Sequence, residues 1–351
     1  MSTKISEIGK VNVIENLFKG SGYFNNQMLQ ISKKGEFCNI QKMFSESIDF
    51  DLVYYPLKHL GYKLAISVIG EIYAKLYNPY SLSFRLSLSS KFSYENLRDF
   101  WHGVLAAAKE HKIEKLSLDL LPSMNGMNVA ISGCGIQKSS ILKQKIPCKS
   151  MDLLCVSGDL GAAFMGFNVL EREKVAYLEL SKVKKAKQPD LSKYKSIVGE
   201  YLSPTIDSDI LSRFLEDNII PSYGCFVSKG LGDAVKTIAK DTAKGVKVYL
   251  SKIPINSQAL DMANELNLDI ITAAMNGGED YRILFVIPIE KHELFRRNFG
   301  DFDIIGHLAQ EEVGEVVVTS EGAEIPIKAQ GWEADPDSNI DLVDDDCEKK
   351  N

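Results

Sequence analysis

Segments with the apolar periodicity of strands alternate along this chain with segments that have the periodicity of helices. In residues 82–88, every second residue is Leu or Phe and the others are Ser or Arg, the pattern of a half-buried strand. Ser93 then caps a predicted helix whose apolar stripe runs from Leu97 to Ala108. Further strand patterns occupy residues 127–131, 153–156, 246–250, 282–287, 303–305 and 315–319. This alternation predicts an α/β or α+β fold.

Two more helical segments support this prediction. One opens at Asp207 or Ser208, and the other begins at Leu231 and is expected to stop at Gly245. The length of 351 residues favours two domains, with a break between about 138 and 151. We therefore divide the chain into residues 1–145, residues 146–332 and a tail.

Composition excludes several classes of protein. The chain is 45% hydrophobic and 25% charged, as in ordinary globular proteins, and no segment has the apolar length of a membrane helix or the form of a signal peptide. The six cysteines are scattered, without the spacing of zinc ligands or of a disulfide framework. We expect a reduced, cytoplasmic protein that does not bind membranes.

The formal net charge of −6 lies entirely in the tail. Residues 333–351 contain eight acidic and two basic side chains, and the rest of the chain is balanced. An acidic segment without apolar periodicity is typical of disorder, and it serves either as a solubilising tail or as a contact for a basic partner. The acid excess argues against direct nucleic-acid binding.

Two glycine clusters are candidates for ligand binding. Residues 157–163 (Ser-Gly-Asp-Leu-Gly-Ala-Ala) follow a strand pattern and lead into a helix start, where backbone N–H groups can approach a phosphate. Tight helix–strand packing is the alternative explanation. Residues 276–281 (Asn-Gly-Gly-Glu-Asp-Tyr) precede the strand at 282–287 and form either a loop turn or a site facing a metal or ligand.

The second cluster carries a family resemblance. Gly-Gly-Glu-Asp-Tyr before an apolar strand that ends at Pro288 resembles a motif of bacterial thiamine-monophosphate kinases, in the aminoimidazole ribonucleotide synthetase-like superfamily. Residues 56–63, 157–163, 252–255 and 329–332 match other segments of that family in the same order. The resemblance covers residues 7–332. It implies a two-domain fold of mixed sheets flanked by helices, with a first domain that forms dimers and carries half of an ATP and Mg²⁺ site.

Members of this family transfer the γ-phosphoryl group of ATP to thiamine monophosphate in a cleft shared by two subunits. Several aspartates from separate loops hold the Mg²⁺ ions that neutralise phosphate charge. The resemblance assigns ligand-binding positions to Asn25, Asn26, Gly158, Gly161, Ser228, Gly230, Gly277, Gly278, Glu279 and Trp332. It assigns remnant metal-binding positions to Glu71, Asp119 and Asp280.

Five of the mapped aspartate positions carry a residue without a carboxylate in this chain. They are Asn25, Asn26, Lys42, Phe226 and Lys229. An amide weakens Mg²⁺ binding, but an ammonium group about 6 Å from a divalent ion costs roughly 5 kcal/mol at an effective dielectric constant near 20. The sequence therefore predicts that Mg-ATP chemistry of the family type is lost, and we assign no residue a catalytic role.

Two of these residues, Lys42 and Lys229, place positive charges where the family binds metal ions. Lys42 and Lys229 are expected either to pair with the surviving carboxylates of Glu71, Asp119 and Asp280, or to point into solvent.

Three functions follow. The first is a non-catalytic homologue that keeps a dimer-forming fold, binds no cofactor and acts as a structural or regulatory partner of another protein. The second is an active or weakly active thiamine-phosphate kinase that uses Mg²⁺ and ATP. The third is one subunit of a heterodimer with an active paralogue.

Overall fold

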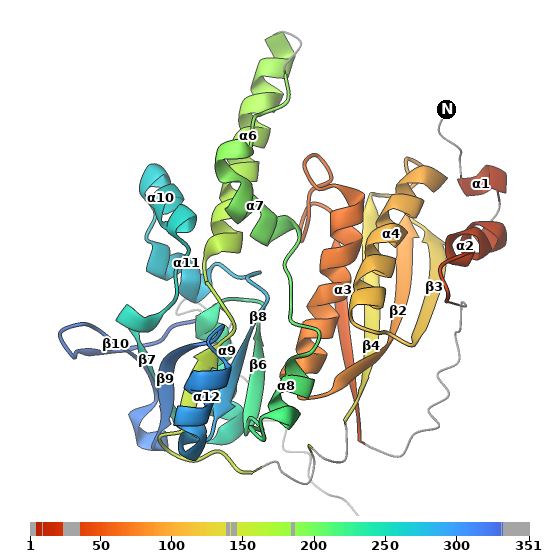
Figure 1. Cartoon of the computed structure of the whole chain (residues 1–351). Coiled ribbons are helices and arrows are strands. Elements are labelled where there is room, and N and C mark those ends of the chain that lie inside the picture. The colour runs from red at the N-terminus through yellow and green to blue at the C-terminus, as the bar shows by residue number, and fades with distance from the viewer. Residues whose placement is uncertain are drawn as a thin grey trace, which may run out of the picture.

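The computed structural model describes residues 5–8, 10–23, 36–137, 141, 146–183, 187–330 and 332. Two sheets form its framework, one from the first part of the chain and one from the second (Figure 1). The last strand of the first sheet ends at Ile136, and the second sheet begins at Leu153. The predicted positions Asn25 and Asn26 and the acidic tail lie outside the described residues.

The first sheet has the strand order β1-β4-β2-β3. Its strands are β1 (Phe37–Ser45), β2 (Asn78–Leu88), β3 (Lys115–Pro122) and β4 (Met127–Ile136). Strand β4 is antiparallel to β1 and β2, whereas β2 and β3 are parallel. The helices α3 (Leu57–Ala74) and α4 (Tyr94–Glu110) cover one face, and alternate residues such as Phe84 point into that core.

Helix α4 begins where the sequence predicts. The Oγ of Ser93 accepts a hydrogen bond from the backbone N–H of Asn96, and the Asn96 side chain accepts one from the backbone N–H of Ser93. This reciprocal pair is a capping box. The buried rings of Phe100 and Trp101 then meet Phe84 edge to face, with centroids 6.3 and 5.8 Å apart.

The second sheet has the strand order β11-β10-β7-β9-β5-β8-β6. Its strands are β5 (Leu153–Val156), β6 (Tyr223–Val227), β7 (Gly245–Tyr249), β8 (Arg282–Ile287), β9 (Asp303–Ala309), β10 (Glu315–Val318) and β11 (Glu324–Pro326). Only β7 and β10 pair in parallel within this sheet. The predicted strands are confirmed as elements, and β5 and β8 have the predicted bounds.

The remaining α-helices are α1 (Ile5–Ile8), α2 (Lys10–Phe18), α6 (Ala162–Val183), α7 (Lys195–Leu202), α8 (Ile210–Glu216), α9 (Leu231–Thr242), α10 (Ser257–Leu266), α11 (Ile270–Asn276) and α12 (His292–Asn298). The 3₁₀ turns are η1 (Ser192–Tyr194), η2 (Leu250–Lys252), η3 (Ile289–Lys291) and η4 (Glu311–Val313).

Two predicted helix ends were wrong by a few residues. Helix α9 ends at Thr242 because Ala243 adopts a left-handed conformation with φ of 52°, so the chain turns before Gly245, which instead starts β7. Helix α8 starts at Ile210, because Asp207 forms a turn in which its carboxylate accepts the backbone N–H of Asp209.

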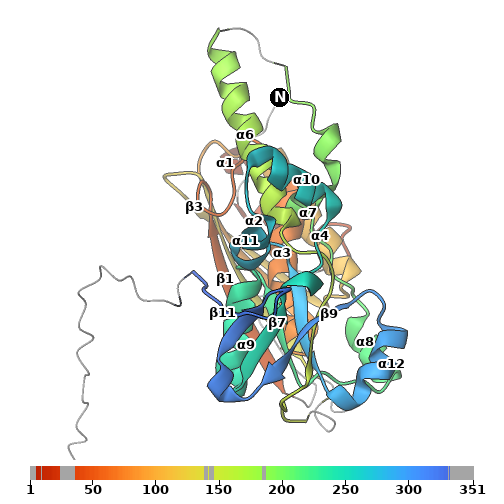
Figure 2. The ribbon, with the colours of Figure 1, turned by 90° about the vertical axis from the view of Figure 1, so that its left-hand side faces the viewer.

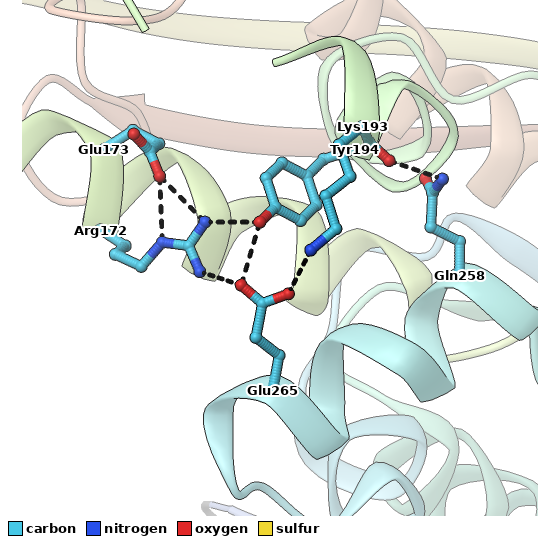
Figure 3. Close-up of polar contacts among 6 residues, drawn as sticks. All are labelled: Arg172, Glu173, Lys193, Tyr194, Gln258 and Glu265. Atoms are coloured by element: carbon cyan, nitrogen blue, oxygen red, sulfur yellow. Dashed lines mark hydrogen bonds and ion pairs between the residues drawn. The ribbon is translucent and has the colours of Figure 1, made fainter. Parts of the chain in front are cut away.

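Helix α6 projects beyond the rest of the molecule, as Figures 1 and 2 show. A polar network ties it to the returning chain and to α10 (Figure 3). Arg172 of α6 donates to Tyr194 and to Glu265 of α10, and Lys193 donates to the same carboxylate. These donors lower the pKa of Glu265 to about 2. The projecting helix is thus fixed near its midpoint by charge-assisted hydrogen bonds.

Helix α3 lies between the two sheets. It contacts β1, β2 and β4 of the first sheet and β6 and β8 of the second, and its residues are buried along nearly the whole length. One continuous core cluster includes Val68 of α3, Phe84 of β2 and Phe285 of β8. The division into two domains remains a prediction. Within the described residues, no helix combines the length and the apolar character that a bilayer crossing requires.

Close contact between α3 and α4 generates the first testable prediction. A Cβ added at Gly61 would lie 2.0 Å from the carbonyl oxygen of Phe100, and one at Gly103 would lie 1.9 Å from that of Lys58. We expect Gly61→Ala and Gly103→Ala each to lower the free energy of unfolding by about 2–3 kcal/mol, because the helices must separate. Urea denaturation measures this change.

The matched control is Gly199→Ala in α7, where nothing lies within 4 Å of an added Cβ. We expect that variant to be as stable as the parent or more stable by up to about 1 kcal/mol, because alanine favours the helix. Equal effects at Gly61 and Gly199 would contradict the close packing of the two helices.

Candidate functional site

The candidate site lies where α3 meets the second sheet. Its central loop is residues 277–281, between α11 and β8. The sequence expected this Gly-Gly-Glu-Asp-Tyr segment to form a turn or a ligand-facing site, and the structure brings it against α3, the start of α6 and the loop 228–230. The backbone N–H groups of Glu279 and Tyr281 donate to the carbonyl oxygens of Ser228 and Val227, at 2.8 and 3.1 Å.

The loop 277–281 holds residues in a conformation that side chains rarely adopt. The φ angles are 77° at Gly278, 62° at Glu279 and 51° at Tyr281. For residues other than glycine this left-handed region costs about 1–2 kcal/mol each. Such outliers persist only where the surroundings fix them, and they cluster at functional sites.

A buried lysine fixes one of these outliers. The ammonium group of Lys63, whose side chain is 3% exposed, donates to the Glu279 carboxylate at 2.9 Å and to the carbonyl oxygen of Tyr201 at 2.7 Å. It lies 3.7 Å from the centroid of the Tyr201 ring and 5.6 Å from those of Tyr55 and Tyr281. Burial lowers the pKa of Lys63, and the Glu279 carboxylate opposes that shift.

Sequence reasoning gave no role to Lys63 or Tyr201. Lys63 lies in the segment 56–63 that carries part of the resemblance, and the available signal was a lone lysine directly before the apolar run 64–69. No pattern in the sequence points to Tyr201 as the partner of Lys63, because the two residues are 138 positions apart and meet only in the folded chain.

Asp280 stabilises the turn at the start of α6. Its two carboxylate oxygens accept the backbone N–H groups of Gly161 and Ala163, at 2.9 and 3.2 Å, and its side chain is buried. Burial raises the pKa of Asp280 to about 7, although both N–H groups favour the charged form. The neighbouring Gly158 has φ of 128°, and the side chain of Arg282 packs directly against it.

The positions predicted to have lost acids differ in what they contact. Lys42 on β1 forms an ion pair with Glu71 on α3, with 3.3 Å between Nζ and Oε1, and lies 5.3 Å from the centroid of the Phe226 ring. Phe226 on β6 is buried against Gly70 of α3 and against Tyr281. Burial lowers the pKa of Lys42, and the Glu71 carboxylate opposes that shift.

The hypothesis of lysine–carboxylate pairing is therefore confirmed for Lys42 and wrong for Lys229. The side chain of Lys229 is exposed, and it forms no ion pair with any residue that the structure describes. The backbone of Lys229 packs against Gly278, and its side chain extends into solvent.

One predicted residue, Asp119, lies apart from this cluster. Asp119 is on β3, and β4 and β2 separate it from Lys42 on β1, a distance of about 14 Å for three strand spacings. Its carboxylate accepts the backbone N–H of Leu120. Trp332 packs against α9, and its indole N–H donates a hydrogen bond to the Asp233 carboxylate of that helix at 2.8 Å.

The structure brings the other predicted residues together. They are Gly158, Gly161, Ser228, Gly230, Gly277, Gly278, Glu279 and Asp280, with Lys42, Glu71 and Phe226 on the side of α3. A cavity of about 230 Å³ opens beside Glu279, lined also by Asp49, Phe164 and Tyr201.

Known proteins include relatives of this chain. No protein-family model matches the chain. The thiamine-monophosphate kinase of Pyrococcus horikoshii is 26% identical over 275 residues, which is 78% of each protein. The chain is a homologue of the thiamine-monophosphate kinases.

Several solved structures have the same fold as this chain. The structure described as AaThiL complexed with AMPPCP and TMP superposes with a TM-score of 0.66 at 18% identity, covering 93% of this chain and 97% of that one. A HypE–HypF complex gives a TM-score of 0.59 at 16% identity, covering 83% and 90%. The predicted fold, with mixed sheets flanked by helices, is confirmed.

The buried carboxyl group of Asp280 generates a prediction about pH. Its folded pKa of about 7 lies above the usual unfolded value of about 3.9. Between about pH 4 and 7 the folded state keeps a proton that the unfolded state has released. The stability of the wild type relative to Asp280→Asn should therefore fall as pH rises through this window, by up to about 1.4 kcal/mol per pH unit, and level off above it.

Urea denaturation of both proteins across that range measures the difference, and carbon NMR of the Asp280 carboxyl group gives its pKa directly. The asparagine variant is the control, because it cannot titrate and the remaining carboxylates are the same. A stability difference that rises with pH would contradict the raised pKa.

Proposed function

We propose that this homologue has lost Mg-ATP phosphoryl transfer and acts as a non-catalytic structural or regulatory partner protein. The observation that carries the proposal is the ion pair between Lys42 and Glu71. In the mapped site, both positions would supply oxygen ligands to Mg²⁺. Here one of the two positions is a lysine, and its ammonium group neutralises the carboxylate of the other, Glu71.

The residues present do not fit a divalent cation. A Mg²⁺ ion bound to Glu71 Oε1 at about 2.1 Å would lie within about 5.4 Å of Lys42 Nζ, because that oxygen and the nitrogen are 3.3 Å apart. Repulsion at this distance costs about 6 kcal/mol at an effective dielectric constant near 20. The apolar ring of Phe226, whose centroid is 5.3 Å from Lys42 Nζ, offers no ligand. We therefore derive no catalytic step through Mg²⁺.

A second candidate function is an active or weakly active thiamine-phosphate kinase that uses Mg²⁺ and ATP. The loop 277–281 favours it, because its strained backbone borders a cavity of about 230 Å³ beside Glu279. Structures of the same fold include AaThiL complexed with AMPPCP and TMP. This candidate requires that the Lys42–Glu71 pair opens on ligand binding.

The partner we propose is a second copy of this chain or a paralogue, together with a further protein. Helices α3 and α4 cover one face of the first sheet, and Phe37 and Met43 on the other face are 43% and 68% exposed. One protein of the same fold, HypE, has been solved in a complex with HypF. We expect the assembly in the cytoplasm, with no direct contact to nucleic acid.

A turnover assay tests the loss of catalysis. The full chain is incubated with ATP, Mg²⁺ and thiamine monophosphate, and thiamine diphosphate is quantified by chromatography. We expect none above the background without protein. Formation of thiamine diphosphate at a kinase-like rate, with one ADP released per product, would refute the proposal and establish the second candidate.

Substitution of Lys42 tests whether its positive charge is what excludes Mg²⁺. We expect Lys42→Asp to gain a Mg²⁺ site with Glu71, so that its melting temperature rises when Mg²⁺ is added. The wild type should show no such rise, because the ammonium group repels the ion. Lys42→Met is the matched control, since it removes the positive charge without adding a ligand. A rise of the same size in the wild type would contradict this explanation.

A further inference from the structure

The aromatic ring of Trp332 brings two lysines of α9 together at the surface of the second part of the chain. Lys236 and Lys240 are four residues apart, so both project from the same face of that helix. Their Nζ atoms lie 6.0 and 5.9 Å from the centroid of the Trp332 ring. The ring is held there because its N–H group donates to Asp233, about one turn before Lys236.

The segment that leads to Trp332 is anchored to the same helix. Ala329 is only 3% exposed, and the carbonyl oxygen of Lys328 lies 3.2 Å from a Cβ added at Gly232 in the first turn of α9. The backbone N–H of Trp332 then donates to the carbonyl oxygen of Ala329 at 3.2 Å. Residue 333, the first of the acidic tail, therefore starts beside α9.

The lysines on this face have few acidic partners. Lys240 is exposed, and neither it nor Lys244, just after the end of α9, forms an ion pair with a residue that the structure describes. Lys236 lies 3.8 Å from the Glu315 carboxylate. We call Lys236, Lys240 and Lys244 the α9 lysines.

The acidic residues of α9 itself are hydrogen-bonded to other groups. Asp233 accepts the indole N–H of Trp332, and Asp241 accepts the hydroxyl group of Tyr223 on β6. Neither carboxylate therefore takes the place of a partner for Lys240.

The tail that begins on this surface has the opposite charge. Residues 333–351 hold eight acidic and two basic side chains, and three of the acids, Glu333, Asp335 and Asp337, come within the first five residues. Five residues span at most about 18 Å when extended, so these acids stay within reach of the α9 lysines. A tether this short holds them at an effective concentration in the millimolar range.

We propose that the acidic tail, residues 333–351, binds the α9 lysines of its own chain and covers the exposed part of Trp332. Several ion pairs act together here, which is the condition under which surface pairs contribute measurably. Salt screens such pairs, so the contact opens as the ionic strength rises. The bound tail removes both its acids and the α9 lysines from contact with other charged molecules. The inference concerns a surface of the molecule and does not depend on the proposed function.

Tryptophan fluorescence reports on this contact, because the chain has two tryptophans and the other one, Trp101, is fully buried. Acrylamide, a neutral quencher, is added to the full chain and to a full-length variant in which the eight acids of residues 333–351 are Asn or Gln. We expect the quenching constant of this neutral-tail variant to be at least about twofold higher, because the tail no longer covers Trp332. The wild type should reach the same value in about 0.5 M NaCl.

Lys240→Gln tests the helix side of the contact. The matched control is Lys195→Gln, because Lys195 is an exposed lysine on α7 without an ion pair to a described residue. We expect Lys240→Gln to raise the quenching constant of the full chain but not that of the neutral-tail variant, and Lys195→Gln to change neither. Equal effects of the two substitutions, or equal quenching of the wild type and the neutral-tail variant, would overturn the proposal. Thermal melting verifies that each variant is folded.

Carbodiimide coupling identifies which tail is bound. The reagent joins a lysine to a carboxylate that it contacts, and mass spectrometry locates the joined peptides in a mixture of isotope-labelled and unlabelled chains. We expect residues 333–351 to be joined to the α9 lysines only within chains of the same label. Joined pairs between labelled and unlabelled chains would overturn the assignment to the same chain in favour of a second copy. The absence of any joined pair would overturn the contact itself.

Discussion

The arrangement of the two sheets depends on the contacts that the buried ammonium group of Lys63 makes. A charge taken out of water costs several kcal/mol unless it is paired and hydrogen-bonded. Here Glu279 and the carbonyl oxygen of Tyr201 accept from it, and three tyrosine rings surround it. Lys63 belongs to α3, on the first sheet, and its partners belong to the second part of the chain. Any rotation of one part against the other would leave this charge unpaired.

The same contact explains why the loop 277–281 can keep its strained backbone. Glu279 has a left-handed φ, and its carboxylate is held by Lys63 while its backbone N–H is held by Ser228. The following residue, Asp280, is held by the N–H groups at the start of α6. Consecutive residues are thus fixed from three directions, which is the condition under which such conformations persist.

Local patterns in the sequence predicted the elements well and their assembly poorly. Alternation at residues 82–88 and the Ser93 cap depend only on neighbouring residues, so β2 and α4 were confirmed. The distance between Asp119 and Lys42 depends on the strand order β1-β4-β2-β3, which no local pattern encodes. The family resemblance identified Lys42 as a residue in place of an acid, and only the packing of β1 on α3 shows that Glu71 is its partner.

Three carboxylates at the loop 277–281 each have a partner within the chain. Glu71 is paired with Lys42, Glu279 with Lys63, and Asp280 with two backbone N–H groups. A cluster of carboxylates binds a divalent cation because the ion relieves their mutual repulsion. Here that repulsion is already relieved by two lysines and a helix start. A ligand entering the cavity beside Glu279 therefore meets a carboxylate that Lys63 already neutralises without a metal ion.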